Sequence, residues 1–513
     1  MNHRSFGPPA GTVPLPSLSC AWRSAIIVAA VLSLSAAPQV RAQGRIVPVA
    51  DAAALTAAVA AAQPGDTIVL AGGDYLLRHK LNLVQAGRPD APITLRAAAL
   101  GEARLVFSDA TGVVEGLHVQ APDWVLENLD IEGRCGADDN CEHALHIVGQ
   151  ADRTVLRGSR LHGFNAQIKG NGMDLGGATG WVWPDDVRIE RTEFFNPAPR
   201  NTGNPVTPID VVGGRRWIVR DNFIHDHAKG GGDGISYAAF LKGNSRDGLF
   251  ERNLVVCELL HKGRTRLGLS FGGGGSGPDR ICEEGTCTPE HQGGIMRNNL
   301  ILHCPADVGI YLNEAADSQV LHNTLYDTGG GIDIRFAASS VTLIGNLLPG
   351  RIRDRDGGRS VRDLNREGVT AAQWAAWFAD AGNLDFRLKA GAEIADSGRS
   401  LPQLPDDYCG AARADGRPDL GAVELGTGCD TRPAAWAGLA AGPGATPTVA
   451  APTVAATAMG SATPTGVATG TAGATSTAMA TAEPTATRPV ATATATRTVA
   501  TERPRLLLPR LGR

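Results

Sequence analysis

The middle of the chain repeats one short unit, and this repeat restricts the fold more than any other feature of the sequence. Each copy holds a short apolar segment, an asparagine, a second apolar segment and a polar or glycine-rich turn. The clearest copies are GLFERNLVVCELL (248–260), GIMRNNLILHCPA (294–306), SQVLHNTLYDTGG (318–330) and SSVTLIGNLLPGR (339–351). Asn299, Asn323 and Asn346 follow one another at intervals of 24 and 23 residues. A period in this range is typical of a solenoid.

The apolar segments of the repeat are expected to be strands. Each is about 3–6 residues long, and none shows helical periodicity. Stacked strand–turn–strand units predict an all-β parallel β-helix rather than a leucine-rich horseshoe. Only 5% of the residues are aromatic, which fits a narrow interior filled by Val, Ile and Leu.

The repeated asparagines predict a structural ladder. Asn222 and Asn253 are 31 residues apart, and the 46 residues from Asn253 to Asn299 equal about one period plus an insert near 271–293. Asparagines stacked at one turn of successive coils satisfy each other and the neighbouring backbone. We therefore expect hydrogen bonding, not catalysis, from this row.

A solenoid needs protected ends, because open strand edges pair with other chains. Asp51–Ala62 reads as an amphipathic helix with Asp51 at its N-cap. Thr370–Asp380 reads as a second short helix in a loop-rich closing segment. These two helices are the expected caps of the β-helix.

The two ends of the chain have a different composition from the repeat. Basic residues, the apolar stretch Ala25–Ala37 and small residues before Gln43 predict a cleaved export signal, with an uncleaved anchor as the alternative. The Ala/Thr/Pro-rich C-terminal tail predicts a disordered stalk. Its last residues, Arg503–Arg513, suggest surface attachment or an ordinary tail end. The expected parts are a signal peptide (1–42), an N-terminal cap with the first coils (43–118), β-helix repeats (119–350), a closing segment (351–430) and the tail (431–513).

Charge and cysteine content indicate where this chain works. Residues 43–430 hold 38 basic and 50 acidic side chains, a net charge of −12, which argues against general nucleic-acid binding. Eight cysteines remain once Cys20 leaves with the signal. An even number in an exported chain predicts disulfides. The expected pairs are Cys135–Cys141, Cys282–Cys287, Cys409–Cys429 and, on neighbouring coils, Cys257–Cys304, with zinc as the alternative for the two short loops.

Three segments of the sequence carry a family resemblance. PGDTIVLAGGDY (64–75), DAPITLRA (90–97) and RPDLGAVEL (417–425) resemble the opening and final strands of the pectin-lyase-like superfamily. The resemblance covers about 45–425 and implies a right-handed parallel β-helix. That superfamily includes polysaccharide lyases, glycoside hydrolases, epimerases and members without known activity, so the activity stays open.

The resemblance also implies a place for catalysis within Ile224–Arg266. Lys242, in FLKGNS, resembles the catalytic base of calcium-dependent pectate lyases, although a leucine is interposed in the motif. Asp233, in GGGDGISY, resembles an aspartate of their calcium strand without the full acidic cluster. Arg264 or Arg266 would pair with a sugar carboxylate. For each of these residues an ordinary surface or strand-end position is the alternative.

Three further residues are candidates from position alone. Asp174 and Asp210 are expected at equivalent places in consecutive coils, where their carboxylates would share one face as a cation site or an acid/base pair. Two turn aspartates are the alternative. His227, in the HDH turn, would serve as a base, or as part of a polar surface turn.

The sequence therefore supports three functions. The first is an exported lyase that cleaves a uronate polymer by β-elimination, with Lys242 as base and Ca²⁺ held by Asp210 and Asp233. The second is a non-catalytic, carbohydrate-binding surface module. The third is a glycoside hydrolase that uses Asp174 and Asp210. In each case the expected partner is a polysaccharide and the expected form is a secreted or surface-attached monomer.

Overall fold

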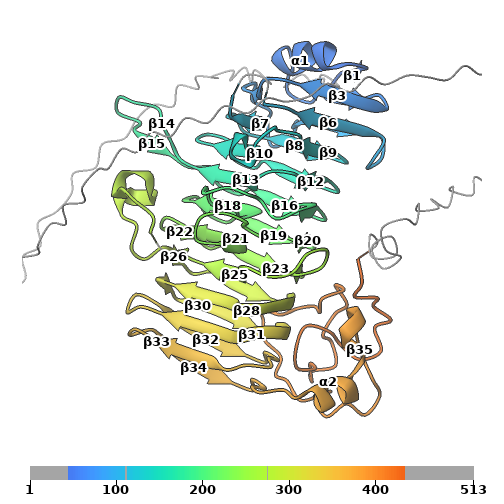
Figure 1. Ribbon diagram of the computed structural model, residues 1–513, viewed down its shortest axis with the longest axis vertical. Helices are drawn as coiled ribbons and strands as arrows, with labels where there is room; N and C mark the ends of the chain where they lie inside the picture. The colour runs from blue at the N-terminus through green and yellow to red at the C-terminus, as the bar shows by residue number, and fades with distance from the viewer. Residues whose placement is uncertain (1–43, 110–111, 274, 434–513) are drawn as a thin grey trace, which may run out of the picture. The chain divides into compact units, whose positions relative to one another are not determined.

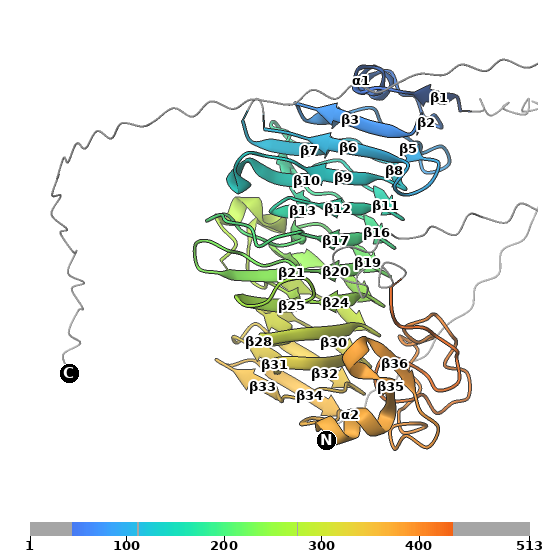
Figure 2. The same cartoon turned by 45° about the vertical axis from the view of Figure 1, so that its right-hand side comes forward.

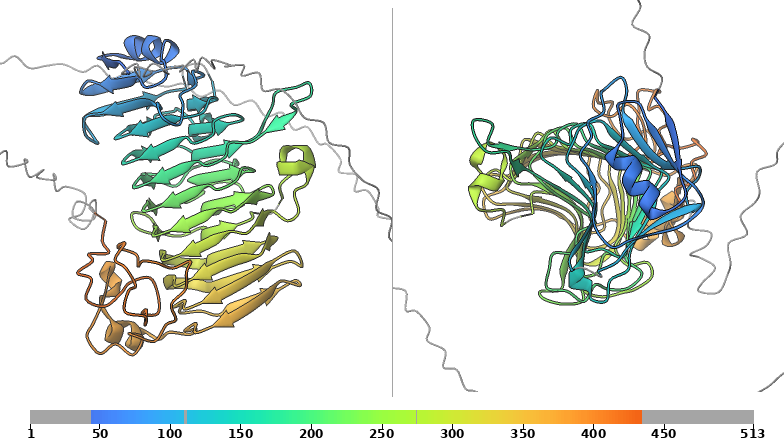
Figure 3. Two further views of the ribbon diagram at one scale, coloured as in Figure 1. Left: turned by 180° about the vertical axis from the view of Figure 1, so that it is seen from behind. Right: turned by 90° about the horizontal axis from the view of Figure 1, so that it is seen from above.

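A computed structural model describes residues 44–109, 112–273 and 275–433. The expected signal peptide and the expected tail from residue 434 onward lie outside the described residues. Within them the chain winds into stacked coils with three faces, a right-handed parallel β-helix (Figure 1; Figure 3, right). This confirms the fold that the repeat predicted.

Face 1 is a sheet of twelve parallel strands that pair in chain order. They are β1 (Ile46–Val49), β2 (Thr67–Leu70), β5 (Ile93–Ala97), β8 (Trp124–Glu127), β11 (Val155–Arg157), β16 (Arg188–Glu190), β19 (Ile218–Arg220), β23 (Leu249–Glu251), β27 (Ile295–Arg297), β30 (Ser318–Leu321), β32 (Ser340–Ile344) and β34 (Arg359–Asp363).

Face 2 follows face 1 in each coil after the asparagine turn. Its strands are β3 (Gly73–Leu77), β6 (Ala103–Phe107), β9 (Asp130–Gly133), β12 (Arg160–His162), β17 (Glu193–Phe195), β20 (Phe223–His225), β24 (Leu254–Val256) and the first halves of β28 (Leu300–Asn313) and β31 (Thr324–Arg335). The pairing is again parallel throughout.

Face 3 completes each coil. Its strands are β4 (Leu81–Leu83), β7 (Val114–Val119), β10 (Cys141–Val148), β13 (Ala166–Asn171), β18 (Ile209–Val212), β21 (Ile235–Lys242), β25 (Thr265–Phe271), the second halves of β28 and β31, and β33 (Ile352–Arg355). Because successive residues of a strand point to opposite sides, each strand buries one set of side chains in the bore and turns the other set outward.

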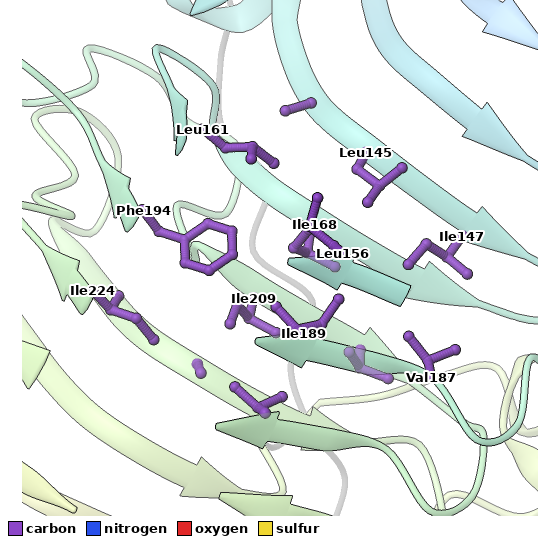
Figure 4. Close-up of a cluster of buried hydrophobic side chains, with 14 of the residues drawn as sticks. Leu145, Ile147, Leu156, Leu161, Ile168, Val187, Ile189, Phe194, Ile209 and Ile224 are labelled. Carbon is purple, nitrogen blue, oxygen red and sulfur yellow. The ribbon is translucent and has the colours of Figure 1, made fainter. Parts of the chain in front are cut away.

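Aliphatic side chains fill the interior of the coils. Leu145, Ile168 and Ile209, on neighbouring strands of face 3, are each 0% exposed and point toward side chains from face 1 such as Leu156 and Ile189 (Figure 4). Burial of such side chains is the main favourable contribution to folding. It also leaves every second residue of face 3 free to face outward.

The asparagine ladder forms at the turn between faces 1 and 2, as expected. The Nδ2 of Asn253 donates to Oδ1 of Asn299 at 2.9 Å, and Asn299 donates in the same way to Asn323 at 2.9 Å. The same bond links Asn222 to Asn253 at 3.0 Å and Asn323 to Asn346 at 3.0 Å. Each Oδ1 also accepts the backbone N–H of the preceding asparagine.

The four expected disulfides are present. They are Cys135–Cys141, Cys257–Cys304, Cys282–Cys287 and Cys409–Cys429. The zinc alternative is excluded, since these thiols are bonded to each other. Four disulfides fit an oxidising, extracytoplasmic environment. Among the described residues no helix combines the length and apolar character needed to cross a bilayer.

The N-terminal cap confirms the expectation closely. Helix α1 (Ala52–Ala60) begins after Asp51, whose side chain accepts the N–H of Ala54 at 2.8 Å. Leu55 and Val59 are buried against the first strands. The helix therefore covers the open edge of the first coil (Figure 1).

The closing segment does not cap the far end as expected. Helix α2 (Ala371–Trp377) is shorter than predicted, because the chain turns into β35 (Phe378–Asp380), which pairs antiparallel with β36 (Asp385–Leu388). This segment lies beside the last coils (Figure 2). Its aromatic side chains, such as Trp374, pack on outward residues of face 2, such as Leu254 and Leu300.

Short elements decorate the turns between the faces. They are the hairpin β14 (Met173–Asp174) and β15 (Trp181–Val182), the small sheet β22 (Ser245–Arg246), β26 (His291–Gln292) and β29 (Ala315–Ala316), and the 3₁₀ turns Asp138–Asn140, Asp279–Ile281, Glu283–Gly285 and Ala381–Asn383. The hairpin and the turns at 279–285 project from the coils next to face 3 (Figure 1).

Candidate functional site

An outward row of polar side chains crosses the upper half of face 3. His118 on β7 pairs in register with His146 on β10, which pairs with Lys169 on β13 and then with Asp210 on β18. Phe240 on β21 continues the row. Adjacent strands are about 4.8 Å apart, so these side chains are direct neighbours although they come from five separate coils. We call this row the face 3 column.

A lysine–aspartate pair occupies the centre of the column. The Nζ of Lys169 lies 2.8 Å from Oδ1 of Asp210, and Asp210 is only 5% exposed. Burial opposes its ionisation, but the charges of Lys169 and Lys242 outweigh that effect and hold the pKa of Asp210 below its ordinary value. Asp210 is therefore a buried carboxylate between two ammonium groups.

Lys242 ends the same strand as Phe240. Its Nζ lies 4.5 Å from the centroid of the Phe240 ring, a cation–π contact. A β-carbon at Gly273 would lie 3.1 Å from Cδ of Lys242, so the loop 272–290 confines the stem of this side chain. The ammonium group makes no hydrogen bond or ion pair with another described residue and is free to bind an anion.

A cluster of imidazoles surrounds Glu115 at the other end of the column. Oε1 of Glu115 lies 3.1 Å from Nδ1 of His146 and 3.8 Å from Nδ1 of His143. Its Oε2 lies 3.1 Å from Nζ of Lys80. His118 stacks on His146 with the ring centroids 5.1 Å apart. The imidazoles of His143 and His146 hold the pKa of Glu115 far below its ordinary value.

Two of these histidines are neutral near pH 7. Burial and the charges of His146 and Lys80 lower the pKa of His118 to about 4. Burial also lowers the pKa of His143, and the nearby carboxylate of Glu115 offsets this only in part. Among the described residues Nδ1 of His143 has no hydrogen-bond partner. This nitrogen lies 3.8 Å from Oε1 of Glu115, and in the sheet register His143 is opposite Ala166, three residues before Lys169.

Loops border the face 3 column at both ends. The Nε1 of Trp183, just after β15, donates to the carbonyl of Ile281 at 3.2 Å, which ties the hairpin to the loop 272–290. At the far end a cavity of about 420 Å³ is lined by Lys80, Glu115 and Glu142. The column is thus enclosed by projecting segments while its polar groups remain reachable from solvent.

A larger cavity, of about 740 Å³, lies on face 1 instead. Its floor is apolar, and its rim carries acid–base pairs such as Asp123–Arg153 at 2.7 Å and Asp186–Arg216 at 2.6 Å. These charges neutralise one another across neighbouring coils. The paired charges of this rim contrast with Lys242 at the end of β21, which has no ion-pair partner among the described residues.

The structure separates the residues that the sequence grouped with Lys242. Arg266 is 1% exposed, and its guanidinium donates to the carbonyls of Gly263, Cys257 and His261. It stabilises its own loop and cannot reach a sugar carboxylate. Arg264 lies at the opposite end of the strand pair, beside Ile235, about 23 Å from Lys242 at the rise of a β-strand.

His227 is also not placed for catalysis. It is 0% exposed, and its Nε2 lies 3.2 Å from the carbonyl oxygen of Leu267. Burial lowers its pKa to about 3. A neutral ring sealed inside the protein is a core side chain rather than a base that meets a substrate.

Asp174 and Asp210 do not occupy equivalent positions on consecutive coils, contrary to the expectation. Asp210 pairs with Lys169 of the preceding coil. Asp174 lies beyond that strand, in the β14–β15 hairpin opposite Trp181, where it accepts the N–H of Gly176 at 2.8 Å. An insertion after Asn171 displaced this aspartate from the coil. The paired carboxylates needed for a hydrolase are therefore not formed by these two residues.

The residues proposed for Ca²⁺ do not converge either. Asp233 is bound by Lys229, whose Nζ lies 2.8 Å away, and it sits at the start of β21, whereas Asp210 lies beside Lys242 near its end. Ca²⁺ takes six to eight oxygen ligands. In the described parts of the chain the one group of acidic, His or Cys side chains with metal-ligand spacing is Glu115, His118 and His146. That group has one carboxylate and two imidazoles, so it does not fit Ca²⁺.

Five site residues escaped the sequence analysis: Glu115, His118, His143, His146 and Lys169. A signal for them exists in the strands VEGLHV (114–119), CEHALHIV (141–148) and AQIKGN (166–171). Each of these strands carries one or more ionisable residues between apolar ones. Placing these strands side by side, rather than the asparagine turns, would have aligned the column.

No family model matches the sequence, and no curated protein is similar to it. Solved structures of similar fold include pectate lyase Pel9A (14% identity, TM-score 0.48, 75% of this chain and 97% of that one) and a rhamnogalacturonan lyase (13%, 0.45, 68% and 96%). Another is a GH136 lacto-N-biosidase from Eubacterium ramulus (13%, 0.47, 64% and 68%). At such identities no activity carries over. The coils themselves define the class, a right-handed parallel β-helix.

Proposed function

We propose that this protein is an exported polysaccharide lyase that cleaves a uronic-acid-containing polymer by β-elimination. The observation that carries the proposal is the sequence of groups along face 3: a neutral imidazole, a lysine on a buried aspartate, and a second lysine without a direct counter-ion. Cationic side chains bind sugar carboxylates, and a neutral imidazole accepts a proton. Here a neutral imidazole and a cationic side chain stand on the adjacent strands β10 and β13.

Lys169 suits the reacting sugar. Removing the proton from C5 of a uronate places negative charge next to its carboxylate, so a nearby cation stabilises the transition state more than the ground state. Lys169 has three donors, and one of them is used by Asp210. The buried aspartate fixes the ammonium in position and leaves its other donors for the substrate.

His143 suits the role of proton acceptor. It lies on β10, the strand next to Lys169, and its pKa responds to the charge of Lys169. Its side chain is 13% exposed, and Nδ1 makes no hydrogen bond with a described residue, its distance to Oε1 of Glu115 being 3.8 Å. In the elimination, this imidazole takes the C5 proton, the electron pair forms the C4–C5 double bond, the C4–O bond breaks and the leaving oxygen takes up a proton from solvent water.

Lys242 suits a neighbouring sugar. It lies two strands from Lys169, about 10 Å away at the spacing of a sheet. This distance is that of a subsite rather than of the reacting carbon. We therefore assign Lys242 to substrate binding instead of the base role that the resemblance implied.

The test follows an unsaturated product. The full chain is incubated with a panel of uronate polymers, and the ultraviolet absorbance of the new double bond is recorded. We expect Lys169→Ala and His143→Ala to lower kcat about 1,000-fold and Lys242→Ala to raise KM about 10-fold. The exposed Lys262, substituted by Ala, is the matched control and should change neither parameter more than about 2-fold.

The outcomes separate the three functions considered. Absence of product from every polymer, with polymer binding that requires Lys169 and Lys242, would replace the lyase by a binding module. New reducing ends without ultraviolet absorbance would indicate hydrolysis. Export and surface attachment belong to the same proposal, and detection of the protein in culture medium or on intact cells tests them.

A further inference from the structure

Three side chains at the upper end of the face 3 column are arranged as metal ligands. One ligand atom from each of Glu115, His118 and His146 lies within 4.8 Å of the others. Glu115 and His118 lie on β7, and His146 lies on the adjacent strand β10. Each side chain is half-buried, so an ion here would be held by the sheet and still meet solvent.

The hydrogen bonds of His146 determine which nitrogen faces the cluster. Asn171 donates its Nδ2 to the carbonyl of Gly172 at 2.8 Å, which leaves its Oδ1 to face Nε2 of His146 at 2.6 Å. Nε2 must therefore carry a hydrogen. Nδ1 then points at Oε1 of Glu115, 3.1 Å away. Two lone pairs repel each other at that distance unless a proton or a cation lies between them.

The other two ligands are restrained in a similar way. Lys80 holds Oε2 of Glu115 at 3.1 Å, which leaves Oε1 as the coordinating oxygen. The Nδ1 of His118 lies 3.0 Å from Nε2 of Gln120 and 3.3 Å from Oδ1 of Asn82. The tautomer that donates its Nδ1–H to Asn82 presents Nε2 to an ion. Such outer partners orient the imidazoles of metal centres.

The donor set selects the class of metal. Two imidazoles and one carboxylate are typical ligands of zinc and other first-row transition ions, and a set of three leaves one position open. Ca²⁺ and Mg²⁺ prefer sites made of oxygen. We propose that Glu115, His118 and His146 bind a divalent first-row transition metal such as Zn²⁺. This site does not depend on the proposed lyase function.

Metal binding can be measured without any substrate. The full, untagged chain is stripped with chelator and titrated with Co²⁺, whose visible absorption reports imidazole coordination, and with Zn²⁺ by calorimetry. We expect one high-affinity ion per chain and retention of Zn²⁺ in about 1,000-fold excess Ca²⁺. Zn²⁺ should also raise the Tm, because it binds only the folded state.

Substitutions locate the ion. Glu115→Gln, His118→Ala and His146→Ala should each weaken Co²⁺ binding at least about 100-fold, and Asn171→Ala about 10-fold. His303 is the matched control, since its Nδ1 also faces a carboxylate, Asp327 at 2.7 Å, but without a second imidazole. His303→Ala should bind Co²⁺ normally.

Two results would overturn the proposal. One is a stripped chain that gives no Co²⁺ spectrum and no Zn²⁺ heat. The other is binding that persists unchanged in Glu115→Gln and His146→Ala, or that His303→Ala abolishes. Because neither readout uses polysaccharide, a failure here is distinct from a failure of the lyase assay. Circular dichroism of each variant separates loss of the site from loss of the fold.

Discussion

The asparagine ladder and the face 3 column are both rows of polar side chains across successive coils, yet they differ in composition and in hydrogen bonding. The ladder repeats one residue, and its amides donate to and accept from their neighbours while 0–2% exposed. The column does not repeat one residue type: it runs from two histidines, His118 and His146, to Lys169 and Asp210. It also keeps charged groups close to solvent, such as the ammonium group of Lys169.

This difference separates a structural row from a chemical one. A buried polar group stabilises a fold when it is fully hydrogen-bonded, and repetition of one residue achieves that in every coil. A site that binds ligand must retain unused donors and acceptors. The comparison makes predictions that run from stability to activity.

The largest expected effect is acid destabilisation by buried histidines outside both rows. Burial lowers the pKa of His227, His291 and His322 to about 3 each, whereas an unfolded histidine titrates near 6.5. The unfolded chain therefore binds more protons between these values. Stability should fall as pH drops below about 6.5, by up to about 4 kcal/mol per pH unit for the three together.

The change of unfolding free energy with pH is measured by denaturant unfolding at about pH 7.5, 6.5, 5.5 and 4.5. His291→Gln should make the curve less steep by about 1.4 kcal/mol per pH unit. A stability that stays constant from pH 6.5 to 4.5 would contradict the neutral state of these rings. It would also remove the contrast between imidazoles sealed in the core and those on face 3.

The next effect concerns the ladder itself. Asn299→Leu removes the acceptor of two bonds from Asn253 and the donor to the carbonyl of Phe250. Leaving such groups buried and unpaired should lower the free energy of unfolding by about 3 kcal/mol. Asn365, at the half-buried end of the ladder, is the control, and its Ala variant should lose about 1 kcal/mol. Equal losses at the two positions would show that the ladder is not the stabilising unit.

A smaller stability effect is expected at the Lys169–Asp210 pair. Lys169→Met leaves a carboxylate 5% exposed without its partner, which should cost about 2 kcal/mol at pH 7. The double variant Lys169→Met/Asp210→Asn removes the buried charge and should recover most of that loss. Activity should stay absent in both. Recovery of activity in the double variant would argue that the pair is structural, as the ladder is.

The smallest effects are expected for residues that the sequence predicted for the site but that lie away from the face 3 column. Asp174→Asn and Arg264→Ala should each change stability by less than about 0.5 kcal/mol and activity by less than about 2-fold. These side chains are outside the face 3 column. A 100-fold loss of activity in either of them would extend the site to the opposite end of the strands.

The sequence predicted the local design of the fold well. Alternating apolar residues and a repeated asparagine identify the coils, the interior and the ladder. Cysteine spacing identified three of the disulfides, and the repeat identified the fourth, Cys257–Cys304. Of the face 3 column the sequence predicted only Asp210, together with Lys242 at the end of the neighbouring strand. The closing segment was misjudged because its aromatic residues indicate burial without indicating which surface they cover.

Adjacency on the outer surface was decided only by tertiary structure. Glu115 and His146 meet across 31 residues, and Lys169 and Asp210 across 41, because inserted turns and the β14–β15 hairpin lengthen individual coils. Interior positions must recur because the bore has a constant width, so their pattern is visible in the chain. Outward positions have no such constraint, and only the strand register brings His118, His146, Lys169 and Asp210 into one row.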